Sequence, residues 1–270
     1  MMRSFRIIAL CICTVLTLAG TARADVDIVG GLTRQMTMLP GDKVEGKLLL
    51  RNNADRPDHV KIYQTDYSFS ADGKDMYPDP GKAERSNASW ITFTPRDINI
   101  APRETISVYY TVQMPSDSKL SGTYWSMLMV EPLPDDSMLA NSKNAGIHVG
   151  IRMVTRYAVQ MVTNIGDSGA RDVRFSNGRI VDGTDKRTAF FDVENTGERW
   201  LNPQLWAEVF DESGVSLGRF EGDKMRLYPG CSGRFRLDLS RLPKGNFSAL
   251  VVADNGDEHV FGSQYKFQLK

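Results

Sequence analysis

The chain has very little cysteine. Cys11 and Cys13 lie in an apolar run near the N-terminus, and Cys231 is the only cysteine beyond it. A single cysteine cannot form a disulfide within its own chain, so a fold held together by disulfides is excluded for the residues after that run. Cys231 lies in the glycine-rich stretch YPGCSGR, which indicates a passive turn residue. A reactive thiol is the alternative, but no neighbouring base or second cysteine supports it.

Residue patterns typical of catalysis are also absent. His59, His148 and His259 fall in separate segments, without the spacing of a metal site or a catalytic triad. There is no nucleophile elbow, phosphate loop or paired-cysteine motif. Asp135-Asp136 is interpreted as a solvated acidic pair, and the stretch DNGDE at 254–258 as a hairpin turn, because it lacks the ligand spacing of a calcium loop. We therefore predict no enzyme activity, no metal and no cofactor.

No long hydrophobic run follows the N-terminal segment, and neither sign of charge dominates. The chain has 33 Lys+Arg against 33 Asp+Glu, which gives no basic footprint for nucleic acid or for a membrane surface. Residues 1–24 combine arginines, the run IIALCICTVLTLAG and the site Ala22-Arg23-Ala24, which is the layout of a cleaved signal peptide. This run is shorter than the roughly 20 residues of a spanning helix. We predict an exported chain that begins at Asp25, with no stable membrane insertion.

Sustained helical periodicity is missing as well. Short segments rich in Val, Ile, Phe, Tyr and Thr recur between turn signals, which predicts an all-β protein. About seven such segments in each half favour two tandem immunoglobulin-like β-sandwich domains. Residues 48–73 and 190–214 share one layout of strand, Asn-rich turn and aromatic strand, which supports an internal repeat. We place the domains at 25–162 and 163–270, with the small polar stretch TNIGDSG as the linker.

The stretch GTYWSMLMV at 122–130 is apolar on both faces of the predicted strand. Tyr124, Leu128 and Val130 share one face, and Trp125, Met127 and Met129 share the other. The core of one domain covers only one face of a strand. A second layer, a neighbouring domain or a partner must therefore cover the other.

Several short motifs of the first half resemble the periplasmic pilus chaperones of the chaperone-usher family. They stand in the family's order over most of Asp25–Tyr157, whereas the second half resembles the family mainly in its sandwich pattern. In chain order, the motifs are Thr33-Arg34, Asn52-Asn53, TPRDINIAPRE, the Pro115 to Gly122 passage, Glu131-Pro132-Leu133-Pro134, and IHVGIRMVTRY after a polar loop.

The resemblance implies two immunoglobulin-like domains with a cleft that holds a pilin-like subunit. It also implies β-strand donation, for which the alternating residues Ile147, Val149 and Ile151 would supply one apolar face. Arg34 and Arg156 match the family's basic residues, which bind the terminal carboxylate of the client; Arg152 is a rival for the second place. The family usually has lysine where this chain has Arg156.

The resemblance further implies a periplasmic location, pilin-like subunits as partners and an outer-membrane usher as a second partner. Two features depart from the family: the polar loop DDSMLANSKNAG, and a domain junction without the usual proline. A cell-envelope structural or adhesive immunoglobulin-like module therefore stays open as the alternative. An exposed, unpaired strand at Ile147–Met153 would favour the chaperone, and aromatic residues grouped on loop tips would favour the adhesive module.

Overall fold

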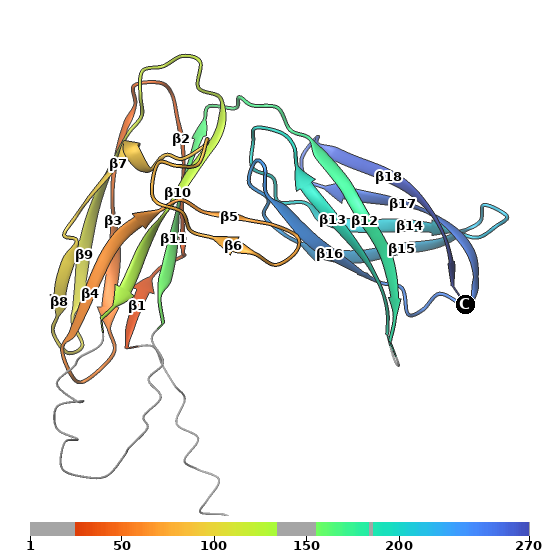
Figure 1. The fold of residues 1–270 in the computed structure, drawn as a ribbon, viewed down its shortest axis with the longest axis horizontal. Coiled ribbons are helices and arrows are strands. Elements are labelled where there is room, and N and C mark those ends of the chain that lie inside the picture. Colours follow the sequence, from red (N-terminus) through yellow and green to blue (C-terminus); the bar gives the residue numbers. More distant parts are fainter. Residues whose placement is uncertain (1–24, 134–154, 184–185, 270) are drawn as a thin grey trace, which may run out of the picture.

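The computed structural model describes residues 25–133, 155–183 and 186–269. Apart from one short 3-10 turn at Ala88–Trp90, all the regular elements of these residues are β-strands. None of the described residues form a helix with the length and apolar character needed to cross a bilayer. The strands group into two β-sandwich domains that meet at one end (Figure 1). The prediction of an all-β protein built from two immunoglobulin-like domains is confirmed.

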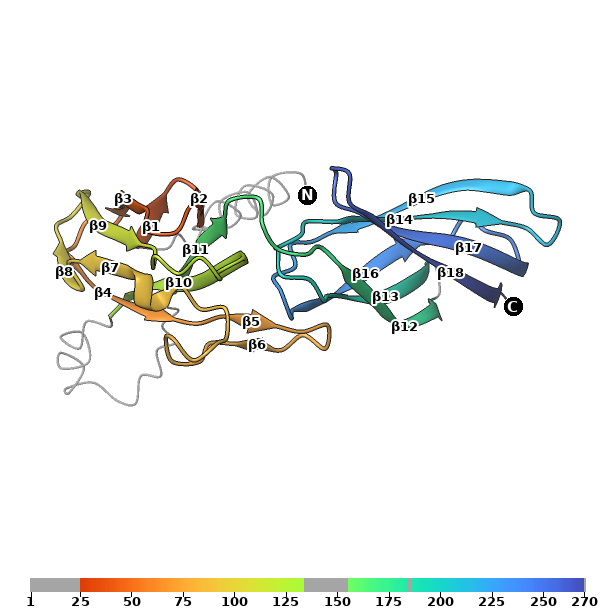
Figure 2. The same cartoon turned by 90° about the horizontal axis from the view of Figure 1, so that it is seen from above.

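The first domain packs a four-stranded sheet, in the order β1-β3-β9-β7, on a five-stranded sheet, in the order β2-β11-β10-β4-β8. A short hairpin, β5–β6, projects from it toward the second domain in both views (Figures 1 and 2). The strands are β1 (Val26–Val29), β2 (Thr33–Met38), β3 (Lys43–Asn52), β4 (Asp58–Thr65), β5 (Ser68–Phe69), β6 (Asp75–Met76), β7 (Ile91–Thr94), β8 (Asp97–Ile100), β9 (Thr105–Gln113), β10 (Gly122–Pro132) and β11 (Tyr157–Ile165).

The sequence predicts one first strand at Asp27–Thr33, but the structure has two strands in this region, β1 and β2, in two different sheets. β1 pairs antiparallel with β3, whereas β2 pairs parallel with β11, Thr33 lying opposite Gln160 and Met38 opposite Ile165. The chain crosses between the sheets after β1, where Gly30 has a φ of 94°, a conformation that favours glycine. The initial segment therefore belongs to both layers of the sandwich.

The strand β10 is covered on both faces, as its sequence requires. Leu128 and Val130 are fully buried in the core of the first domain, and Tyr124 packs against the same core. Trp125, on the opposite face, is only 5% exposed and packs with residues of the second domain. The neighbouring domain is thus what covers the second face at Trp125.

The second domain is a seven-stranded sheet folded over on itself, in the order β12-β13-β16-β15-β14-β17-β18. Its two layers are joined by a single pair, Gly222 with Leu237, and they enclose their own hydrophobic core. The strands are β12 (Val173–Asp182), β13 (Arg187–Asn195), β14 (Gln204–Phe210), β15 (Ser216–Lys224), β16 (Ser232–Asp238), β17 (Gly245–Asp254) and β18 (Val260–Leu269).

Two local features differ from what the sequence suggests. Asn177-Gly178 is a pair typical of hairpin turns, but Asn177 has a φ of 52° and lies in a bulge within β12, where the pairing with β13 shifts register. Residues 163–165, which we assigned to the second domain, belong to β11 because they pair with both β10 and β2. The segment between the domains is therefore 166–172.

Candidate partner-binding surface

One edge of the five-stranded sheet is incomplete beside β11. β2 pairs only with Gln160–Ile165, the last six residues of that strand. Tyr157 and Val159, at the beginning of β11, pair with β10 on one side, and the described residues provide no strand on the other. Within the described part of the chain, this side of Tyr157–Val159 is therefore a sheet edge of the kind to which a further strand can pair.

This edge begins just after the predicted donor segment. Ile147, Val149 and Ile151, together with the rival Arg152, lie outside the described residues, so their prediction stays untested. The chain is described again from Thr155 and enters β11 at Tyr157. Tyr157 is fixed there by a hydrogen bond from its hydroxyl to Asp27 Oδ1, at 2.8 Å.

Arg156 lies at the start of this edge, on the outer face of the sheet. Its guanidinium contacts Glu131 Oε1 of β10 at 2.7 Å, and the Tyr63 hydroxyl donates to the other oxygen of that carboxylate at 2.7 Å. Partial burial opposes ionisation of Glu131, but the bonds from Tyr63 and Arg156 outweigh it and lower its pKa. The Arg156 side chain is still 53% exposed, so it is accessible to a second anion.

Arg34 lies on the opposite face of the sheet, at the edge strand β2. In the parallel pairing it stands beside Met161, a residue of the first domain's core. Its guanidinium donates to the carbonyl oxygens of Gly31, at 2.5 Å, and Thr33, at 3.3 Å. These bonds hold the side chain against the crossover between β1 and β2.

Arg34 and Arg156 are therefore not brought together in this structure. Arg156 bonds to Glu131, on the face of β10 that also carries Trp125, whereas Arg34 is on the face that carries Met161. Each guanidinium already has partners within the first domain. A joint carboxylate anchor made by both arginines stays a prediction.

The domains are joined by a buried aromatic stack. The rings of Trp125 and Tyr228 are 4.7 Å apart and nearly parallel, at 11°. The Trp125 Nε1 group donates to the carbonyl oxygen of Tyr67 at 2.7 Å, and the Tyr228 hydroxyl donates to Oε1 of Gln160 in β11 at 2.5 Å. Arg226 reaches the same Gln160 oxygen at 3.3 Å and lies over the Trp200 ring.

A second set of contacts surrounds Glu198 in the second domain. Its carbonyl oxygen accepts from the Thr123 backbone N–H at 2.8 Å, and its carboxylate accepts from the Ser121 hydroxyl and pairs with Arg85 at 3.2 Å. The hydrogen bond from Ser121 is the largest cause of its lowered pKa. Because Gly122 lies against this backbone, the two domains approach too closely there for a side chain.

Cys231 lies inside this junction and not on an accessible turn. It is 1% exposed and belongs to the same cluster as Trp125 and Tyr228. Burial raises the pKa of its thiol to about 11, so the thiol is protonated near neutral pH. This environment agrees with an unreactive residue.

The residues that join the domains could not be predicted from sequence motifs. Gln160, Arg226 and Glu198 carry no motif, and their contact depends on how the two domains dock. The one available signal was Trp125, whose face of β10 needed a cover. The described residues also contain no cluster of three or more His, Cys, Asp or Glu suited to a metal ion.

The fold and the junction define a two-domain protein of immunoglobulin-like β-sandwiches with an incomplete sheet edge. No protein-family model matches the sequence, and no curated protein matches it. Solved structures similar to this chain include a chain of a chaperone-tip adhesin complex of CFA/I fimbriae biogenesis. The identity is 11%, the TM-score is 0.49, and the match covers 90% of this chain and 98% of that chain. The class 5 fimbriae chaperone CfaA has 10% identity, a TM-score of 0.48, and coverage of 88% and 98%. The CsuC-CsuE complex of Acinetobacter baumannii has 14% identity, a TM-score of 0.46, and coverage of 91% and 98%.

Proposed function

We propose that this protein is a periplasmic chaperone that binds pilin-like subunits and stabilises them by donating a β-strand. The donated residues are Ile147, Val149 and Ile151, whose alternation gives one apolar face. The proposed activity is binding and not catalysis. An outer-membrane usher would receive the loaded subunit.

The observation that carries the proposal is the incomplete sheet edge at Tyr157–Val159. Donation requires a strand with one side bound to its own sheet and the other side free for the client. Among the described residues β11 has this arrangement, because β10 occupies one side and the pairing with β2 on the other side begins only at Gln160. The alternating segment precedes this edge directly in the sequence, so a client paired with that segment would continue the same sheet.

Arg156 is the better placed of the two proposed carboxylate anchors. It is more than half exposed at the start of the edge that the described residues leave unpaired, and its planar guanidinium suits a carboxylate. Binding a client's terminal carboxylate would require Arg156 to share or release Glu131. Arg34 would have to give up its bonds to backbone carbonyls, and it would act on the other face of the sheet.

The test is whether pilin-like subunits co-purify with this protein from the periplasm of a cell that produces both. The amount of subunit that co-purifies is the measure of capture. Val149→Asp places a charge in the proposed apolar face and should reduce subunit capture by about tenfold or more. The matched control is His148→Asp, on the opposite face of the same segment, which should retain capture. Arg156→Ala should weaken capture strongly and Arg152→Ala only slightly, because only Arg156 is proposed as an anchor.

Thermal unfolding of each variant separates lost binding from lost folding. Equal capture by the wild-type protein and Val149→Asp would exclude strand donation from this segment. Retention of envelope proteins or polysaccharide without any pilin-like subunit would instead support the adhesive module. Full capture by Arg156→Ala would remove this residue from the anchor.

A further inference from the structure

The two domains have the same strand order, with two exceptions. Listed from β1, the first domain reads β1-β3-β9-β7 and then β8-β4-β10-β11-β2, whereas the second reads β12-β13-β16-β15-β14-β17-β18. β15 takes the places of both β7 and β8, because it pairs with β14 and bridges to β16. Every remaining strand has a counterpart except β2, which the described part of the second domain lacks.

The strand registers locate where that missing strand would lie. In the first domain Gly122 of β10 pairs with Ile165 of β11, and in the second Gly245 of β17 pairs with Leu269 of β18. β2 lies along Gln160–Ile165, so the corresponding six residues of the second domain are Gln264–Leu269. On this side of β18 the described residues provide no paired strand.

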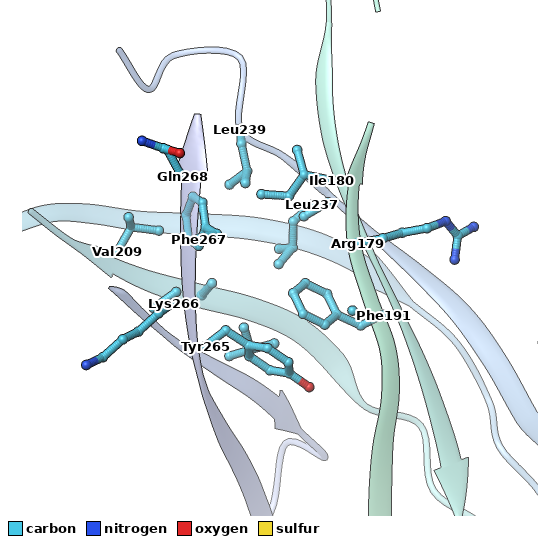
Figure 3. A pocket seen from close by; sticks show the side chains of 15 residues that line it. Arg179, Ile180, Phe191, Val209, Leu237, Leu239, Tyr265, Lys266, Phe267 and Gln268 are labelled. Atoms are coloured by element: carbon cyan, nitrogen blue, oxygen red, sulfur yellow. The ribbon is translucent and has the colours of Figure 1, made fainter. Parts of the chain in front are cut away.

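A cavity of about 240 Å³ opens at this position, between the edge strands β12 and β18. Tyr265 and Phe267 of β18 line it, and Ile180 lines it from β12. Figure 3 shows the side chains of Ile180, Leu237 and Phe267 converging on this space. Their inner neighbours are core residues, among them Phe191 and Val209, so the gap leads directly into the hydrophobic core of the domain.

The Tyr265 side chain closes the gap at Gly178, where an added Cβ would lie only 3.0 Å from its Cε1 atom. Two residues further along β12, Ile180 lines the cavity and is only partly buried. The bulge at Asn177 sets this geometry by bending β12 where the two edges meet.

We propose that this gap is a binding site for an extended peptide segment of a partner protein. The segment pairs with Gln264–Leu269 of β18, in the parallel orientation that β2 has on β11, and closes the second domain as β2 closes the first. β2 places Met36 and Met38 in the core of its own domain. The partner segment accordingly has apolar side chains at alternate positions, which fill the cavity.

The lining favours a peptide over a small acidic molecule. A small-molecule site combines apolar walls with a few polar groups that converge on the ligand. Here the charged neighbours, Arg179 and Lys266, point away from the cavity in Figure 3, and Arg179 lies over the Phe190 ring. What the site offers is apolar volume beside a strand edge, and an extended backbone uses both. The inference is independent of the proposed function, which depends on the first domain.

The test is titration of the isotope-labelled protein with blocked hexapeptides, followed by amide chemical shifts and hydrogen exchange. The probes are the β2 sequence TRQMTM and derivatives with isoleucine or phenylalanine in place of both methionines. A derivative with aspartate at both positions is the control. Binding should shift the amides of Tyr265–Gln268 and Ile180 and slow exchange along β18. N-methylation of the peptide on the side that faces β18 should abolish binding.

Two protein variants give a matched comparison. Ile180→Asp places a charge at the mouth of the cavity and should weaken peptide binding by about tenfold or more. Val181→Asp changes the next residue, which is 49% exposed, and should alter binding by less than about twofold. Equal unfolding temperatures of the two variants would show that the difference arises at the site.

Three results would overturn the proposal. One is that no apolar peptide binds at about 1 mM, or that the amide chemical shifts that change on titration belong to residues outside β12 and β18. Another is a dimer, seen in sedimentation, that the peptides dissociate, because the occupant would then be a second copy of the chain. The third is that laurate shifts these amides while no peptide does, which would identify a site for a small apolar molecule.

Discussion

The stacked pair Trp125 and Tyr228 predicts how strongly the two domains depend on each other. Tyr228 is 1% exposed, its ring stacks on Trp125 at 4.7 Å, and its hydroxyl bonds Gln160. Tyr228→Ala leaves a cavity at the junction and should lower the free energy of unfolding by about 3–5 kcal/mol, the usual cost of truncating a buried aromatic residue. Tyr228→Phe keeps the ring and should cost about 0.5–1.5 kcal/mol, the value of one hydrogen bond.

Urea unfolding followed by far-ultraviolet circular dichroism measures both changes. A double-mutant cycle with Trp125→Ala isolates the stacking, which should be about 0.5–1.5 kcal/mol beyond the buried area. Since the pair joins the domains, Tyr228→Ala should also separate their unfolding into two transitions. Tyr109→Ala is the control: that side chain is 60% exposed, and its removal should change stability by less than about 0.5 kcal/mol. If Tyr228→Ala had as little effect as this control, our description of the junction would be refuted.

Two further predictions concern the same junction. Because burial raises the pKa of Cys231 from 9.0 to about 11, maleimide at pH 8 should label it only in urea. Fast labelling of the folded protein would contradict the buried position of this thiol. Because the thiol of the unfolded chain loses its proton at a lower pH than the buried one, the free energy of unfolding should fall as pH rises from 9 to 11. This fall should be smaller in Cys231→Ala. Gly122→Ala should lower the unfolding temperature much more than Gly214→Ala, because its Cβ would lie 2.2 Å from the Glu198 carbonyl oxygen, whereas Gly214 has open space at a similar φ. The added overlap should cost about 1–3 kcal/mol, and equal losses would contradict the close approach of the domains.

The sequence predicted most of the fold because strand alternation records which side chains are buried. Leu128 and Val130 face one core and Trp125 faces the other domain, as their spacing indicated. The split of the first segment into β1 and β2 was missed, because a chain that crosses between sheets keeps the same alternation. Asn177-Gly178 suggests a turn where the structure has a bulge, because an Asn-Gly pair favours positive φ in hairpin turns and in bulges alike.

The candidate site could be predicted only in part. Sequence order placed Arg156 just before β11, where the described residues leave one side of the strand without a paired neighbour. Its partner Glu131 and the separate face of Arg34 depend on strand register, which short motifs do not determine. The contacts of Gln160 with Tyr228 and Arg226 depend on domain docking and leave no local signal.

The pairing of β2 with β11 also has a consequence for the order of folding. These strands come from the beginning and the end of the first domain's sequence, and their parallel ladder forms only when Gln160–Ile165 are available. Contacts between distant segments form slowly, because a long loop must close first. A chain that emerges N-terminus first must therefore keep Met36 and Met38 unburied until the whole first domain has appeared. During this interval β2 is a short strand without its partner, and the exposed side chains of Met36 and Met38 make it open to premature association.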